Sequence, residues 1–198
     1  MVWRTLLALL TCIIVPGLAA AQTAQAPTYK IGDEWRYERT SIRVAAVEPE
    51  QYTFNISGST TCVECQYTYD GNRTLLKVAN KEGKPVEGTT TVGLKLMQFP
   101  MSVGVTWTAN QLLRQRNTPD LIPYDNTFTV VAYEDVKTKA GTFKAYKIVW
   151  EQENKATYRH WKGRLFRWYS PDVKNWVKQE VLTPRWFDDF ELQSYSLK

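Results

Sequence analysis

Two cysteines with two residues between them, Cys62 and Cys65, are the residues in this chain best placed to do chemistry. In an oxidising compartment, neighbouring cysteines usually form a disulfide. Residues three apart in an extended strand lie roughly 10 Å from each other, whereas a disulfide needs Cα atoms within about 7 Å. The pair must therefore lie in a turn or bulge, which the preceding Ser57-Gly58-Ser59 favours. We interpret the pair as a structural disulfide, with free or redox-active thiols as the alternatives.

Other cysteine chemistries fit the surrounding sequence less well. A thioredoxin-like site needs the first cysteine at the start of a helix, but the residues that follow, Gln66 to Tyr69, have the composition of a strand. Haem attachment needs a histidine where Gln66 stands. A structural zinc site needs four ligands, and the chain offers one histidine and a third cysteine only at Cys12, inside the N-terminal apolar run. We therefore predict no metal and no cofactor.

Two further features have residue types that occur in catalytic sites. His160 is the only histidine, its cationic neighbours oppose its protonation, and no Gly-x-Ser-x-Gly elbow accompanies it. The acidic cluster Asp188, Asp189 and Glu191 lacks the spacing of a calcium-binding loop. We interpret both as solvent-exposed features and predict no catalytic residues. A hydrolase that uses His160 with Asp188 and Asp189 is an alternative.

Aromatic residues are the last candidates, because they can line an apolar pocket for an acyl chain or stack on sugar rings. They can equally be the core of a curved sheet, since alternation shows which face a residue takes but not what covers that face. The candidates for lining a ligand cavity are Trp35, Trp107, Tyr146, Trp150, Trp161, Trp168 and Trp176.

The elements that must position these residues are predicted to be strands. Residues that favour strands dominate from Tyr29 onward, and apolar residues alternate with polar ones from Tyr52 to Ile56. Turn signals at hairpin spacing separate the runs. The clearest hairpin is at Asp70-Gly71, where we expect glycine to supply the positive φ of a tight turn, and another is at Ala140-Gly141.

This pattern predicts an all-β fold of about nine to eleven strands. We expect a strongly curved antiparallel sheet, either a half-barrel or a barrel-like sandwich. Thr108 to Arg116 is the only stretch that we consider for a short helix.

The N-terminus has the order of features found in signal peptides. Arg4 precedes an apolar run from Leu6 to Val15, and Ala19-Ala20-Ala21 supplies small residues for cleavage. The run is shorter than the roughly 20 residues of a membrane-spanning helix. We predict a signal peptide over residues 1–21, a disordered leader over 22–28 and a single β domain over 29–198. The mature protein is expected to be soluble and periplasmic.

Charge does not point to nucleic acid as a partner. The formal net charge is +5, and lysines and arginines are interspersed with acidic residues along the whole chain. A nucleic-acid-binding domain would gather them on one stripe or patch. We therefore predict that the protein does not bind nucleic acid.

Three segments resemble a known group of proteins. They are Gly32-Asp-Glu-Trp35-Arg-Tyr37, Ala140-Gly141-Thr-Phe143-Lys-Ala-Tyr146-Lys-Ile148 and Trp168-Tyr169-Ser-Pro171-Asp-Val173 with the following Val177-Lys178-Gln-Glu180. In this order they are similar to blocks of an exported bacterial family of unknown function. The layout of that family resembles the half-barrels of periplasmic lipoprotein carriers, an analogy of fold that does not fix a function. The resemblance implies no functional residues.

The leading hypothesis is a non-enzymatic periplasmic protein that binds a hydrophobic ligand, such as a lipid, in an aromatic-lined concavity. It depends on the predicted export, the aromatic content and the lack of a catalytic constellation. A structural or protein-interaction module of the envelope, recruiting a partner by strand addition, is the first alternative. A thiol-redox protein that uses Cys62 and Cys65 is the second.

Overall fold

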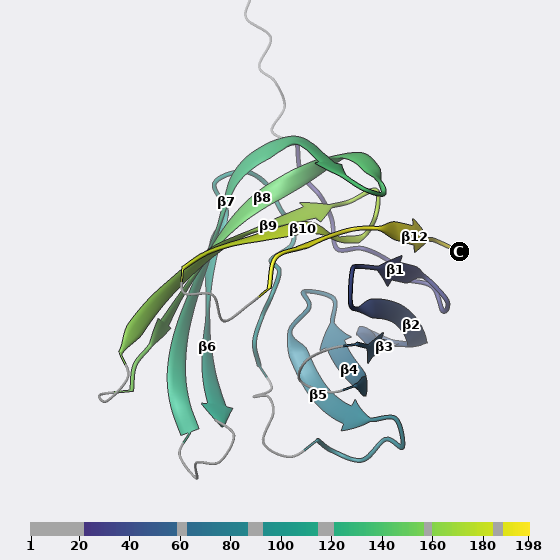
Figure 1. The fold of residues 1–198 in the computed structure, drawn as a ribbon, viewed down its shortest axis with the longest axis horizontal. Coiled ribbons are helices and arrows are strands. Elements are labelled where there is room, and N and C mark those ends of the chain that lie inside the picture. Colours follow the sequence, from purple (N-terminus) through teal and green to yellow (C-terminus); the bar gives the residue numbers. More distant parts are fainter. Residues whose placement is uncertain (1–21, 59–62, 87–92, 115–120, 157–159, 184–187) are drawn as a thin grey trace, which may run out of the picture.

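The computed structural model describes residues 22–58, 63–86, 93–114, 121–156, 160–183 and 188–198 (Figure 1). These residues form twelve strands and no helix, so the all-β prediction is confirmed. The strand number exceeds the expected nine to eleven because three strands have only two or three residues, too few to leave a pattern in the sequence. Within these ranges, no helix has the length and apolarity that crossing a membrane requires.

The first sheet contains the N-terminal strands and the last strand of the chain. Its spatial order is β12-β1-β2-β3-β4-β5, and all neighbouring strands are antiparallel. The strands are β1 (Glu34–Arg36), β2 (Ser41–Glu48), β3 (Gln51–Ser57), β4 (Glu64–Asp70), β5 (Leu75–Asn80) and β12 (Ser194–Ser196).

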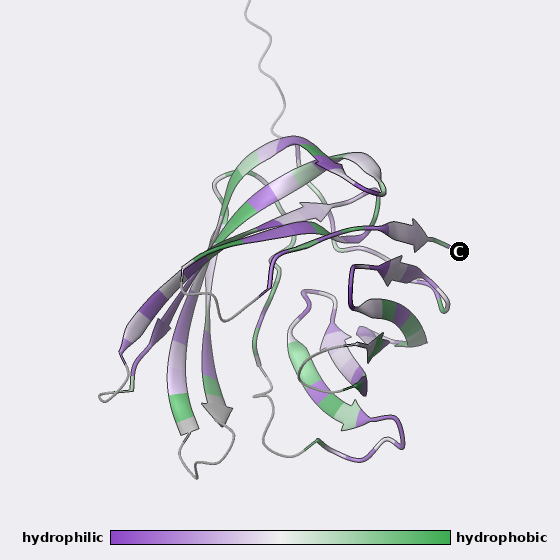
Figure 2. Ribbon diagram, viewed as in Figure 1, coloured by the Kyte–Doolittle hydropathy of each residue, from purple (hydrophilic) through white to green (hydrophobic). Residues whose placement is uncertain are grey.

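The second sheet is built from the C-terminal half, also with antiparallel neighbours only. Its order is β11-β10-β9-β8-β7-β6. The strands are β6 (Thr106–Arg114), β7 (Leu121–Thr138), β8 (Gly141–Asn154), β9 (Trp161–Ser170), β10 (Asn175–Thr183) and β11 (Phe190–Glu191). Hydrophilic and hydrophobic residues interleave along its long strands, as expected of strands whose two faces have different surroundings (Figure 2).

The two sheets meet where the chain passes from β11 to β12. The backbone N–H of Leu192 donates to the carbonyl of Val177 on β10, and the N–H of Gln193 donates to that of Arg36 on β1, both at 2.8 Å. The strand order therefore continues from one sheet to the other through this segment, and the second sheet arches beside the first (Figure 1). At the opposite ends, β5 and β6 are not paired with each other among the described residues, so the structure is an open, strongly curved arrangement and not a closed barrel.

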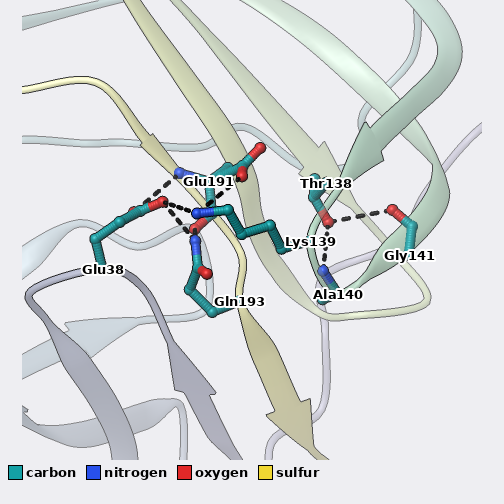
Figure 3. A network of polar contacts seen from close by, with 7 residues as sticks. All are labelled: Glu38, Thr138, Lys139, Ala140, Gly141, Glu191 and Gln193. Carbon is teal, nitrogen blue, oxygen red and sulfur yellow. Dashed lines mark hydrogen bonds and ion pairs between the residues drawn. The ribbon is translucent and has the colours of Figure 1, made fainter.

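A polar network links the two sheets at this junction (Figure 3). Lys139, in the turn between β7 and β8, places its Nζ 3.9 Å from a carboxylate oxygen of Glu38 and 3.8 Å from one of Glu191. Gln193 donates from Nε2 to the same Glu38 carboxylate. Lys139 and Glu38 are exposed and Glu191 is half-buried, so the network orients the turns and contributes little net stability.

Two apolar clusters form most of the core. The first lies between the sheets and includes Trp35, Phe54, Tyr69, Val173 and Leu192. The second lies against the second sheet and includes Trp107, Phe128, Tyr146, Trp150 and Tyr169, with Met97 and Met101 covering them from the β5–β6 connection. The two faces of the second sheet contribute to different clusters: on β9, Phe166 and Trp168 pack in the first, and Leu165 and Tyr169 in the second.

Two local predictions were wrong. Thr108 to Arg116 was considered for a helix, but residues up to Arg114 form β6, paired with β7 from Thr106↔Thr129 to Arg114↔Leu121. Sheet pairing overrides the weak helix preference of this stretch. The Asp70-Gly71 hairpin exists, but its positive φ belongs to Arg73 (55°) and not to Gly71. The Asp70 carboxylate accepts from the N–H groups of Asn72 and Thr74, each at 2.8 Å, and so fixes the turn.

The expected leader, residues 22–28, lies against the second sheet. Ala24 forms a two-way backbone bridge with Met101, with both hydrogen bonds at 2.8 Å. The hydroxyl of Tyr146 donates to the carbonyl of Gln22 at 3.0 Å. The predicted signal peptide, residues 1–21, lies outside the described residues.

Candidate ligand-binding site

Most of the aromatic residues predicted to line a ligand cavity are packed inside the two clusters. Trp35, Trp107, Tyr146, Trp150, Trp168 and Trp176 are buried, and Trp161 is half-buried against Tyr124. Trp150 and Trp161 border a cavity of only about 10 Å³.

The buried indoles also have polar partners that hold them in place. Nε1 of Trp35 donates to the carbonyl of Val173 at 2.7 Å, and Nε1 of Trp107 donates to that of Lys95 at 3.1 Å. Nε1 of Trp168 donates to the Glu134 carboxylate at 2.8 Å. These contacts make the indoles part of the packed framework, and only Trp176 of the predicted set lines the larger pocket described next.

A pocket of about 580 Å³ opens between the two sheets beside their junction. This volume is within the range of ligand sites, roughly 300 to 1,000 Å³. Both sheets and the β5–β6 connection supply its apolar wall, which consists of Tyr37, Ile42, Ile56, Tyr69, Leu96, Trp176 and Phe190. The wall is therefore suited to a hydrophobic group.

Arg73 forms part of the pocket and is almost completely buried, with an exposed fraction of 5%. The positive φ at this residue follows from the Asp70 turn. The guanidinium lies 4.1 Å from the ring centre of Phe54 and 5.1 Å from that of Tyr29. Its Nε donates to the Tyr29 hydroxyl at 3.1 Å, and one terminal nitrogen donates to Oδ1 of Asn175 at 3.3 Å.

Arg167 on β9 is the second cation of the pocket. It lies 4.7 Å from the ring centre of Trp150 and 5.3 Å from that of Trp176. Its Nε donates to Oε1 of Gln179 at 2.5 Å. Burial lowers the pKa of the guanidinium to about 10, so Arg167 remains a cation at neutral pH.

Neither arginine has an acidic counterion in the part of the chain that the structure describes. Among the described residues, no carboxylate oxygen lies within 4.0 Å of either guanidinium. Buried charges in proteins are normally paired. Burial raises the pKa values of Tyr37 and Tyr69, and the charges of Arg73 and Arg167 partly offset this rise at both tyrosines. The electrostatic fields of the two arginines therefore act on the same part of the pocket.

Asn175 adds an unpaired donor to this pocket. The side chain is completely buried at the start of β10, and its Oδ1 accepts from Arg73 and from the backbone N–H of Trp176. Its Nδ2 has no hydrogen-bond partner in the described structure. An unsatisfied buried donor costs about 1–3 kcal/mol, and such a group calls for an explanation.

Exposed charged residues surround the mouth of the pocket. They are Glu38, Arg39, Asp188 and Asp189. The two aspartates make local contacts: the Asp188 carbonyl accepts from Gln179 at 2.7 Å, and the Asp189 carboxylate accepts from the N–H of Val181 at 2.7 Å. The mouth is thus mixed in charge, whereas the charged residues described in the interior, Arg73 and Arg167, are both cations.

The other sequence candidates lie apart from this arrangement. His160 is exposed and contacts Glu153, with Nε2 to Oε1 at 2.7 Å, and neither aspartate of the acidic cluster is its partner. Within the described ranges, no three His, Cys, Asp or Glu side chains gather as metal ligands. Cys65 is buried at the start of β4. Cys62 lies outside the described residues, so their disulfide stays a prediction.

The cationic interior was missed by the sequence analysis, although one signal for it exists. Arg167 is at an even spacing from Leu165 and Tyr169, which belong to the second cluster. A charged residue between two core residues on one face of a strand breaks the period-two pattern. Arg73 and Asn175 follow turn residues and leave no comparable signal.

Comparison with protein families gives one match. Residues 126–195 match the family model described as DUF3108-like. This range begins within β7 and ends in β12, so it covers most of the second sheet and the junction. A comparison with curated proteins gives no match.

Comparison with solved structures gives matches over most of this chain at low sequence identity. One from Bacteroides fragilis, assigned as an exported protein with a YmcC-like fold, is 15% identical, with a TM-score of 0.53 over 87% of this chain and 99% of that one. The hypothetical lipoprotein YmcC of Escherichia coli is 14% identical, with a TM-score of 0.49 over 84% of this chain and 82% of that one. The first similarity shows a shared fold and nothing about activity.

Proposed function

We propose that this chain is a non-enzymatic, exported protein that binds a hydrophobic ligand, such as a lipid, in the pocket between its two sheets. The observation that carries the proposal is the pocket of about 580 Å³ with walls of aromatic and aliphatic side chains. Open, partly apolar pockets of this size are the usual form of a small-molecule site.

Export is part of the same proposal. It is supported by the signal-like order of Arg4, the apolar run to Val15 and the alanines before Gln22. The shared fold with a protein assigned as exported agrees with it. An envelope location would bring the pocket into contact with lipids and other amphiphiles.

The site differs from the one expected from the sequence. The aromatic residues first considered are mostly framework, and the proposed ligand instead contacts Tyr37, Ile42, Ile56 and Leu96 together with Trp176. The envelope-interaction and thiol-redox hypotheses stay predictions, and no contact of the described residues favours either one over ligand binding.

Native mass spectrometry with lipid extraction tests this proposal. The protein is purified from the periplasm without detergent, and we expect one ligand per chain. Ile56→Trp fills the pocket from β3 and is expected to abolish the adduct, whereas Val47→Trp, at an exposed position of β2, leaves it in place. A bare wild-type polypeptide, or an adduct that Ile56→Trp retains while folded, would contradict the proposal.

A further inference from the structure

The interior of the pocket carries two cations whose charge nothing in the described structure neutralises. Moving an ion out of water carries a desolvation penalty that remains even after the protein relaxes. A cation–π contact with an aromatic ring returns part of this free energy. Arg73 is almost completely buried and Arg167 is half-buried. Their ring contacts offset part of the desolvation cost but supply no hydrogen-bond acceptor.

The hydrogen bonds of these side chains also indicate that a partner is missing. A guanidinium has several N–H donors in a planar fork, and the described residues accept from two nitrogens of Arg73 and from one nitrogen of Arg167. Nδ2 of Asn175 also lacks an acceptor. Arg73, Arg167 and Asn175 thus each have N–H groups with no acceptor among the described residues. A ligand group that satisfies them must be a hydrogen-bond acceptor.

We propose that Arg73, Arg167 and Asn175 form an anion-recognition site, and that the ligand of the pocket is an amphiphile with a single phosphate or carboxylate group. This inference rests on the proposed function, since the apolar wall takes the chain of the same molecule. Planar guanidinium groups bind carboxylate and phosphate through paired, charge-assisted hydrogen bonds. The asparagine amide supplies a neutral donor to the same anion.

The position of the three residues sets the orientation of the ligand. Arg73 and Asn175 are the most buried residues of the lining, whereas the acidic residues Asp188 and Asp189 are exposed at the mouth. The anionic group enters the interior, and the chain follows along Ile42, Ile56 and Leu96. The three carboxylates at the mouth outnumber its one cation, Arg39, and so disfavour an anion that stops there.

Calorimetric titration tests the site with three probes: sodium decyl phosphate below its micelle concentration, decanol and inorganic phosphate. The protein is first washed over a hydrophobic resin. We expect decyl phosphate to bind at least about tenfold more tightly than decanol, the effect of one charge-assisted hydrogen bond. Arg167→Gln should remove this preference, and Arg167→Lys should retain part of it. Arg164→Gln, an exposed arginine on the same strand, is the matched control and should change nothing.

The results of the titrations distinguish a failure of the anion site from a failure of the proposed function. Equal affinity for decyl phosphate and decanol overturns the anion site and leaves the hydrophobic pocket standing. Inorganic phosphate that binds as tightly as decyl phosphate assigns the site to a free anion and overturns the amphiphile. If no probe binds, the proposed function fails as well.

A measurement on the wild-type protein tests the anion site even if the Arg167→Gln variant does not fold. Because salt screens charge pairs, raising the ionic strength should weaken the binding of decyl phosphate to the wild-type protein without weakening that of decanol. The same salt response for both probes would count against the anion site.

Discussion

Single side chains with several polar partners hold the second sheet in place. Asn126 on β7 is the clearest case, with an exposed fraction of 1%. Its Nδ2 donates to the carbonyl of Ala109, and its Oδ1 accepts from Nε1 of Trp150 and Nε2 of Gln152, all at 2.9 Å. One amide thus joins three strands, and its removal takes one hydrogen-bond partner from each of three buried groups.

Asn126→Ala should lower the free energy of unfolding by about 2–3 kcal/mol, because the buried partners lose their hydrogen bonds. Asn110→Ala, at an exposed position of β6, is the control and should change it by less than about 0.5 kcal/mol. Urea denaturation of both variants measures the difference. Equal effects would show that the Asn126 contacts contribute no net stability.

Individual candidate residues could be named from the sequence, but the contacts that they make could not. The sequence indicated Trp35 and Trp150 as candidates for the core or for a cavity wall, but not their partners. The carbonyl that Trp35 contacts belongs to Val173, in the turn between β9 and β10, and the amide that Trp150 contacts belongs to Asn126 on the neighbouring strand β7. Arg167 could have been predicted from its place between Leu165 and Tyr169. Arg73 could not, because its direction depends on the Asp70 turn.

Turns decide how the strands of the first sheet follow one another. Gly58, just after β3, has φ of +77°, and a Cβ built there would lie 1.8 Å from the backbone oxygen of Arg39. Gly83, in the turn after β5, has a similar φ of +79° but open space around it. The two glycines therefore separate the effect of backbone conformation from that of close approach.

Gly83→Ala should cost about 1–2 kcal/mol of unfolding free energy from the positive φ alone. Gly58→Ala should cost clearly more, by about 1–3 kcal/mol, because the added methyl group collides with backbone. Thermal and urea unfolding of the two variants provide the comparison. A Gly58→Ala protein as stable as Gly83→Ala would mean that the turn at Arg39 shifts freely.

Strand existence could be predicted from the sequence, whereas register and faces could not. The hairpins at Asp70 and at Ala140-Gly141 are confirmed. Val173, Val177 and Val181 are spaced four residues apart, which would put them on one face of a continuous strand. Val177 lies at a register shift in β10, so the first two join the first cluster and Val181 packs against the second. Bulges of this kind depend on how the sheet curves, which local spacing does not encode.

Burial of tyrosines gives the molecule as a whole a predictable response to alkaline pH. Burial raises the pKa of Tyr69 from 10.0 to about 12, and it also raises the pKa values of Tyr29, Tyr37, Tyr67 and Tyr169. The folded state then holds these protons more tightly than the unfolded state. Their contribution to stability is complete below the unfolded pKa near 10 and is lost as the pH rises through the folded pKa.

We therefore expect the free energy of unfolding to fall between pH values of about 10 and about 12. Arg167 acts in the opposite direction, because its folded pKa is lowered to about 10, but it is one group against several tyrosines. Tyr69→Phe should make the fall less steep, whereas Tyr195→Phe, at an exposed position, should leave it unchanged. Urea unfolding across this range provides the test, and parallel curves for wild type and Tyr69→Phe would contradict the assignment.

The central claim, that an alkyl chain is bound between the two sheets, is tested most directly by a crystal structure with bromine-labelled decyl phosphate. Anomalous scattering locates the bromine at the end of the chain independently of the phasing. We predict one bromine peak within the pocket bordered by Ile42, Ile56 and Leu96, with the phosphate beside Arg167 and Asn175. Bromine found only on the outer surface, with the pocket unchanged, would contradict the account.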